Sequence, residues 1–67
     1  MPVKVKVLGD GEHTVEYREG MKIVDVLKSL GLLVDEYVVS KNGRVVAEDE
    51  EVRDGDEIVL YPVVSGG

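Results

Sequence analysis

The sequence predicts an α+β fold in which one helix packs on one face of a mixed β-sheet. Two observations lead to this prediction. Alternating or continuous aliphatic runs indicate strands near both ends of the chain, and one segment between them repeats its apolar residues with helical spacing. An early hairpin, one helix and later strands are typical of a small α+β roll. The chain has 67 residues, so we expect a single domain, which we place at residues 1–64.

The first predicted element is an N-terminal hairpin. Val3, Val5 and Val7 alternate with lysines, and this period of two is typical of a half-buried strand. A Gly-Asp-Gly turn signal at residues 9–11 follows, and the alternation resumes over residues 13–18. We therefore expect two antiparallel strands joined by a tight turn.

One short helix is predicted after the hairpin. Its apolar residues recur at i, i+3, i+4 and i+7 and form one face; they are Ile23, Val26, Leu27 and Leu30. Lys22 stands at the N-cap position, where a lysine is a poor cap. Gly31 stands where a left-handed C-terminal cap is expected. A helix of about two turns is not stable alone, so it must dock on the sheet.

Two strands joined by a tight turn are predicted after the helix. Residues 37–40 are rich in strand-forming types, and residues 45–46 continue as the return strand. Between them, Asn42-Gly43 is the pair that favours a type I′ hairpin. Either Val38 or Val39 can point inward, because this run does not alternate cleanly.

The last strand is expected at residues 57–61. It follows an acidic segment at residues 48–51 and an Asp-Gly-Asp turn at residues 54–56. We interpret the acidic segment as a solvated turn, with a docking patch for a basic partner as the alternative. The order is therefore β-β-α-β-β-β, which fits the β-grasp fold. In that fold the first and last strands lie parallel to each other at the centre of the sheet.

Composition excludes several classes of function. The chain has no cysteine and one histidine, His13, so we expect no metal site and no catalytic residues, with His13 at the surface. The net charge of −6 argues against nucleic acid and favours a basic partner surface. No apolar run approaches the ~20 residues of a membrane span. We therefore expect a cytoplasmic protein that does not bind membranes and is a monomer when free.

The end of the chain is its most informative segment. Ser65-Gly66-Gly67 follows an apolar run, and we expect residues 65–67 to be a flexible tail that enters a partner's active site. Glycine has no Cβ and passes through narrow channels, so the working group would be the Gly67 carboxylate. Pro62 lacks an N–H and is expected to release the chain from the sheet near this point.

Partner contacts are expected from the apolar residues that precede the tail. These residues are Tyr61, Pro62, Val63 and Val64. In the alternative interpretation, Tyr61 and Val63 fold back onto the core.

The segment from Asp54 to Gly67 resembles the C-terminal signature of the ThiS/MoaD sulfur carriers. These belong to the ubiquitin-like β-grasp superfamily, with archaeal small modifier proteins as close relatives. Residues 22–27 resemble the family's helix start, and Asn42-Gly43 with the return strand resembles its central hairpin, so the resemblance covers the whole chain. In MoaD-like members an aromatic residue at the position of Tyr61 contacts the activating enzyme. Two departures, Lys22 at the N-cap and Val63 in place of a second proline, lie away from the reactive end.

The resemblance implies a protein substrate rather than an enzyme. A ThiF/MoeB-type activating enzyme would use ATP and Mg²⁺ to adenylate the Gly67 carboxylate, and the chain itself would bind no cofactor. Sulfur from a persulfide would then give a C-terminal thiocarboxylate for a sulfur-accepting synthase, in thiamin thiazole, molybdopterin or tRNA thiolation. The choice among these pathways stays open, although the short chain favours the ThiS-like or archaeal modifier branch.

Two other functions are compatible with the same fold. In the first, Gly67 is joined to lysines of target proteins, so that the chain is a covalent modifier. In the second, the chain is a plain binding module. The chain's own lysines are also possible acceptors, and the sequence does not rank them; they are Lys4, Lys6, Lys22, Lys28 and Lys41.

Overall fold

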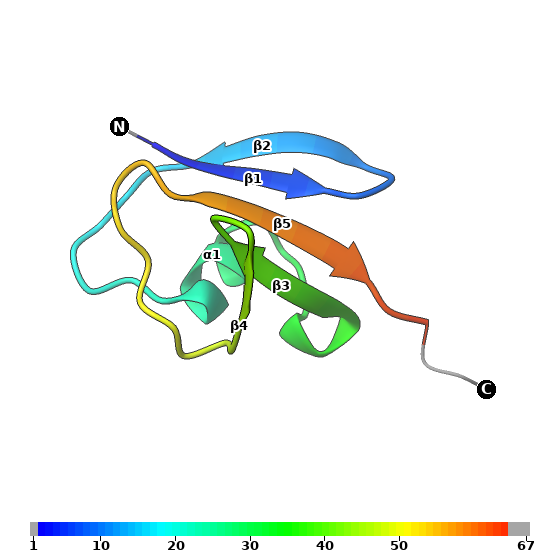
Figure 1. The fold of residues 1–67 in the computed structure, drawn as a ribbon. Coiled ribbons are helices and arrows are strands. Elements are labelled where there is room, and N and C mark those ends of the chain that lie inside the picture. Colours follow the sequence, from blue (N-terminus) through cyan, green and yellow to red (C-terminus); the bar gives the residue numbers. More distant parts are fainter. Residues whose placement is uncertain (1, 65–67) are drawn as a thin grey trace.

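A five-stranded mixed sheet runs through the molecule, with one α-helix on one of its faces (Figure 1). The computed structural model describes residues 2–64, so the predicted tail at residues 65–67 lies outside the described residues. In chain order the elements are β1 (Val3–Val7), β2 (Gly11–Val15), α1 (Ile23–Ser29), the 3₁₀-helix η1 (Val34–Glu36), β3 (Tyr37–Lys41), β4 (Arg44–Val46) and β5 (Glu57–Pro62). The α+β class and the order β-β-α-β-β-β are confirmed, and η1 is an element that the sequence did not predict.

The last strand occupies the centre of the sheet, whose order is β2-β1-β5-β3-β4. β5 is parallel to β1, and Ile58 lies beside Val5. It is antiparallel to β3, and Leu60 lies beside Val39. The predicted parallel pairing of the first and last strands is therefore confirmed. This position explains why β5 carries so many aliphatic residues.

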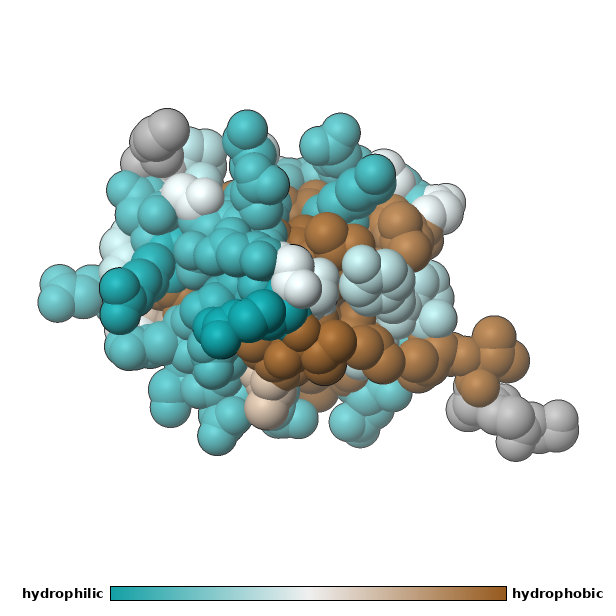
Figure 2. Space-filling view, in the orientation of Figure 1, coloured by the Kyte–Doolittle hydropathy of each residue, from teal (hydrophilic) through white to brown (hydrophobic). Residues whose placement is uncertain are grey.

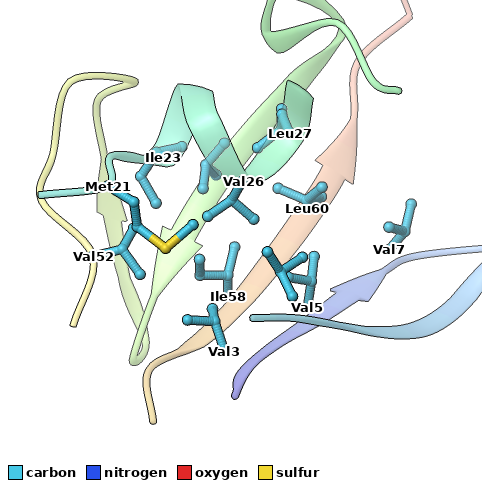
Figure 3. Packing of buried hydrophobic residues seen from close by; sticks show 12 residues of the cluster. Val3, Val5, Val7, Met21, Ile23, Val26, Leu27, Val52, Ile58 and Leu60 are labelled. Atoms are coloured by element: carbon cyan, nitrogen blue, oxygen red, sulfur yellow. The ribbon is translucent and has the colours of Figure 1, made fainter. Parts of the chain in front are cut away.

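The core lies between α1 and the sheet (Figure 3). Ile23, Val26 and Leu27 of α1 are fully buried, as the helical spacing predicted. They face alternate residues of the two central strands, namely Val3, Val5, Val7, Ile58 and Leu60. Leu30 is only partly buried and packs at the margin of this cluster. Burial of each large apolar side chain is worth about 1.5–3 kcal/mol, which gives the seven-residue helix the stability that it lacks alone.

The start of α1 is capped by the main chain of the acidic segment. Lys22 is the N-cap and makes no side-chain cap hydrogen bond. Instead the N–H groups of Ile23 and Val24 donate to the carbonyls of Glu50 and Glu48, each at 3.0 Å. The interpretation of the acidic segment as a solvated turn is therefore incomplete, because its carbonyls satisfy helix N–H groups that no side chain reaches.

The end of α1 is the predicted glycine cap. Gly31 has a φ of +73°, a left-handed conformation that glycine adopts without steric cost. Its N–H donates to Lys28 O at 3.0 Å, and the N–H of Leu32 donates to Leu27 O at 2.9 Å. This pair of hydrogen bonds is the Schellman motif.

The second strand begins and ends earlier than predicted. β2 spans Gly11–Val15, whereas the alternation predicted a strand over residues 13–18 after a turn at residues 9–11. A turn follows in which Met21 N–H donates to Arg18 O at 3.1 Å and Gly20 has a φ of +84°. The chain must turn here to reach α1, so the polar–apolar alternation continues beyond the strand itself.

The hairpin between β3 and β4 has the predicted two-residue turn. Asn42 and Gly43 both have positive φ, +52° and +88°, as a type I′ turn requires. The open question about β3 is settled, since Val39 is buried and Val38 is 40% exposed.

Candidate functional site

The predicted partner-contact residues lie at the end of β5. The strand runs through Pro62, one residue beyond its predicted end. Tyr61 and Val63 are 41% and 44% exposed, and Val64 is almost fully exposed. Neither Tyr61 nor Val63 belongs to the hydrophobic cluster or to the residues packed against it. The alternative in which both fold back onto the core is therefore wrong.

Alternation along β5 places an apolar row on the face that α1 leaves uncovered. Ile58 and Leu60 point into the core, so the residues between and beyond them point to the opposite face. These are Val59, Tyr61 and Val63. Neighbouring strands extend the row, because Val38 lies opposite Tyr61, and Val45 and Val59 both lie opposite Ser40.

We call this set the open-face patch; its members are Val38, Val45, Val59, Tyr61 and Val63. Figure 2 shows hydrophobic surface over β3 and β5 that continues along the C-terminal segment, while hydrophilic side chains cover much of the left of this view. A contiguous apolar area that leads into a chain end is typical of a protein-binding site.

Three members of this patch could not be recognised from the sequence. Val38, Val45 and Val59 gave no motif, because their common face depends on the register of three strands. The sequence contained a signal for one of them, because Val59 lies two residues before Tyr61 and alternate residues of a strand share a face.

Pro62 releases the chain from one neighbouring strand only. Successive N–H groups of a strand point to alternate sides, and Val63 N–H donates to Glu36 O at 2.9 Å on the β3 side. The N–H that Pro62 lacks would therefore face β1. Pairing with β1 accordingly ends at Val7 beside Leu60, whereas bonding on the β3 side continues through residue 63. The expectation that Pro62 frees the chain from the sheet is thus wrong for the β3 side.

The Asp-Gly-Asp turn before β5 is built around the buried Asp56 carboxylate. Its oxygens accept hydrogen bonds from the Asn42 side-chain amide at 2.9 Å and from Arg53 N–H at 2.8 Å. Burial raises the pKa of Asp56, but these two hydrogen bonds and the charges of Lys41 and Arg53 outweigh burial, so the pKa lies below its ordinary value of 3.8. Asn42 also accepts a hydrogen bond from Glu57 N–H at 3.0 Å, so this cluster fixes the start of β5 to the β3–β4 turn.

Comparison with known proteins agrees with this geometry. The model of the ThiS family matches residues 4–67. The chain belongs to the ThiS family. An uncharacterised protein of Archaeoglobus fulgidus is 34% identical to it over 68 residues, which cover all of both chains.

Two solved structures show how widely this ThiS-family fold is shared. SAMP1 from Haloferax volcanii has a TM-score of 0.79 and 26% identity, and all of both chains is covered. The putative molybdopterin converting factor subunit 1 from Pyrococcus furiosus has a TM-score of 0.75 and 27% identity, with 96% of this chain and 99% of that one covered. The ubiquitin-like β-grasp fold and the ThiS/MoaD resemblance are therefore confirmed. Small carriers of the ThiS/MoaD type are generally non-enzymatic subunits.

The lysines of this ThiS-family chain are not equivalent. Lys41 Nζ donates to Glu51 O at 2.9 Å and lies 3.0 Å from Glu50 Oε2, and its side chain is only 11% exposed. The other four lysines are exposed. The structure thus separates one lysine from a set that the sequence left unranked.

Residues 2–64 also bear on metal binding and on membrane insertion. This part of the ThiS-family chain contains no group of three or more His, Asp or Glu side chains arranged to hold a metal ion. No helix in the same range is long and apolar enough to cross a membrane. His13 is exposed, as expected. Ser65, Gly66 and Gly67, the predicted tail, lie outside the described residues.

Proposed function

We propose that this protein is a sulfur carrier whose Gly67 carboxylate is adenylated by a ThiF/MoeB-type enzyme and then converted to a thiocarboxylate. One observation supports the proposal most directly. The family match extends through Gly66 and Gly67, and the apolar row of β5 leads towards that segment. The protein is then a co-substrate, and the activating enzyme supplies ATP and Mg²⁺.

The chemistry requires activation because a carboxylate is a poor electrophile. Attack of the Gly67 carboxylate on the α-phosphate of ATP gives an acyl-adenylate and releases pyrophosphate. A persulfide sulfur then displaces AMP, and a thiol cleaves the resulting acyl disulfide to leave the thiocarboxylate. Gly66 and Gly67 present no side chain to the walls of a narrow active-site channel.

The open-face patch is the surface that we propose for docking on the activating enzyme. Its five side chains lie on one face of the sheet, and all but the partly buried Val59 are exposed. Tyr61 is the candidate anchor, since tyrosine is enriched among residues that dominate binding energy. A partner seated there contacts Val63 as well, and so meets the start of the C-terminal arm.

Covalent modification of target proteins is the second candidate function. The similarity to SAMP1 from Haloferax volcanii, at 26% identity over the full chain, favours it. In this case a lysine amine, rather than a persulfide, displaces AMP and forms an isopeptide bond with Gly67. Activation is the same in both functions, so one protein can perform both.

Sulfur acceptors and location belong to the same proposal. We propose a cytoplasmic protein whose thiocarboxylate is used by a synthase of thiamin thiazole or molybdopterin formation, or in tRNA thiolation. The similarity to a molybdopterin converting factor subunit 1 supports a sulfur-transfer role without selecting among these pathways.

Mass spectrometry of the protein from its native host tests the proposal. For a carrier, we expect the mass change that replacement of one Gly67 carboxylate oxygen by sulfur produces. For a modifier, we expect Gly-Gly remnants on lysines of other proteins. Deletion of Gly67 should abolish adenylation by the cognate enzyme and leave the thermal midpoint nearly unchanged. A Gly67 carboxylate that is unmodified in the host and is not adenylated in vitro would contradict both proposed functions.

A further inference from the structure

We infer that the hydrogen bond from the Val63 amide to the Glu36 carbonyl is a positioning contact that sets where the C-terminal arm leaves the sheet for activation. The bond is 2.9 Å long. The inference rests on the proposed function. It adds a role for η1, which carries Glu36 and which neither the sequence nor the family match assigns to activation.

The arm is held on one side only. Pro62 cannot donate towards β1, and pairing with β1 ends at Val7 beside Leu60. Beyond Pro62, the Val63 amide is the last backbone group with a partner among residues 2–64. A single hydrogen bond therefore defines the origin of the arm.

The acceptor of this bond is held by the 3₁₀-helix. Glu36 N–H donates to Leu33 O at 3.0 Å, and Tyr37 N–H donates to Val34 O. These bonds hold the peptide groups on both sides of Glu36, so the carbonyl that receives Val63 has a fixed direction. η1 thus supports the arm although it lies far from it in sequence.

The origin matters because the arm is short. Gly67 is four residues beyond Val63, and four residues span at most about 14 Å when fully extended. A partner docked on the open-face patch therefore receives Gly67 only if the arm starts in the right direction. Loss of the contact should leave docking intact and lower the fraction of complexes in which the carboxylate reaches ATP.

A matched pair of variants tests this in adenylation kinetics. Val63→Ala and Val63→Pro both remove the valine side chain from the open-face patch, but only proline also removes the N–H. Pro62, the residue before it, is already extended in β5, which is the conformation that a following proline requires. We expect V63P to have a kcat about 3- to 10-fold below that of V63A, the range that one hydrogen bond corresponds to. The two KM values for the carrier should be similar.

A third variant retains the side chain. A synthetic chain with a backbone ester in place of the Val63 amide should show the same fall in kcat relative to the synthetic all-amide chain. Equal kcat values for V63P and V63A would overturn the inference.

Amide hydrogen exchange of the free protein gives a readout that does not depend on any enzyme. The Val63 amide should exchange more slowly than the Val64 amide, whereas equal rates would show that the hydrogen bond between Val63 and Glu36 is absent. Failure of every activating enzyme to adenylate the wild-type protein would instead overturn the proposed function, and the exchange result would distinguish the two failures.

Discussion

Val38 and Tyr61 lie directly opposite each other on β3 and β5, on the face of the sheet that α1 leaves uncovered. Their side chains are 40% and 41% exposed. A cross-strand pair of an aromatic and a β-branched residue stabilises a sheet by about 0.2–1 kcal/mol. The Tyr61 ring is thus supported by a neighbour while part of its surface stays free. A side chain that is already ordered loses less entropy on binding, which suits an anchor residue.

Replacement of this ring tests the open-face patch. Tyr61→Ala should weaken binding to the activating enzyme by about 2 kcal/mol or more, because an anchor at the centre of an interface carries much of its energy. Isothermal titration calorimetry with the catalytically inactive enzyme measures the effect. Tyr61→Phe is the matched control and should bind nearly as well, since it retains the ring. Unchanged affinity of Y61A would remove Tyr61 from the interface.

The helix face gives a prediction about stability. Leu27 of α1 is fully buried in the core, so Leu27→Ala should lower the free energy of unfolding by about 2–5 kcal/mol. Leu33 is 65% exposed, and Leu33→Ala should change it by less than about 0.5 kcal/mol. Urea denaturation of both variants provides the comparison. A small loss for L27A would show that the surrounding side chains collapse into the space.

The elements that the sequence predicted correctly depend on local rules. The helical face of α1 follows from apolar spacing, and the Asn42-Gly43 turn and the Gly31 cap follow from the few residue types that tolerate positive φ. The predicted end of the second strand was wrong, because the apolar alternation and the path of the chain disagree there. The alternation beyond Val15 continued after β2 had ended, because the connection to α1 has to turn there.

The features that the sequence did not reveal depend on residues far apart in the chain. Carbonyls of the acidic segment cap α1 some 25 residues earlier, as the bond from Ile23 N–H to Glu50 O shows. The hydrogen bond between Val63 and Glu36 likewise depends on how β3 is aligned with β5. For the same reason Tyr61 was recognisable as a candidate contact, while its neighbour Val38 became one only after the two strands were aligned.

Asp56 gives a prediction about pH. Its folded pKa lies below the ordinary value of 3.8, so its contribution to stability is fully present above that value. The contribution is lost as the pH falls through 3.8 and on through the lower folded pKa. Asp56→Ala should therefore cost about 1.5–3 kcal/mol at neutral pH, the worth of hydrogen bonds to a charged group. Below the folded pKa the difference between variant and wild type should be smaller.

Chemical denaturation at neutral and acidic pH measures both values. Asp49→Ala is the control for charge alone, since Asp49 is exposed and its side chain makes no hydrogen bond within residues 2–64. A cost of D56A that does not change with pH would mean that packing, rather than the ionised carboxylate, is responsible.

Lys41 should be the least reactive lysine of the folded protein. Its Nζ donates to Glu51 O and pairs with Glu50, and its side chain is 11% exposed, so acylation requires loss of these contacts. Limited acetylation followed by peptide mass spectrometry should show slower labelling at Lys41 than at the exposed Lys28. The difference should disappear in denaturant, which controls for the intrinsic reactivity of each site. If the protein modifies its own copies, isopeptide remnants should likewise avoid Lys41, whereas frequent attachment there would mean that the segment at residues 48–51 opens readily.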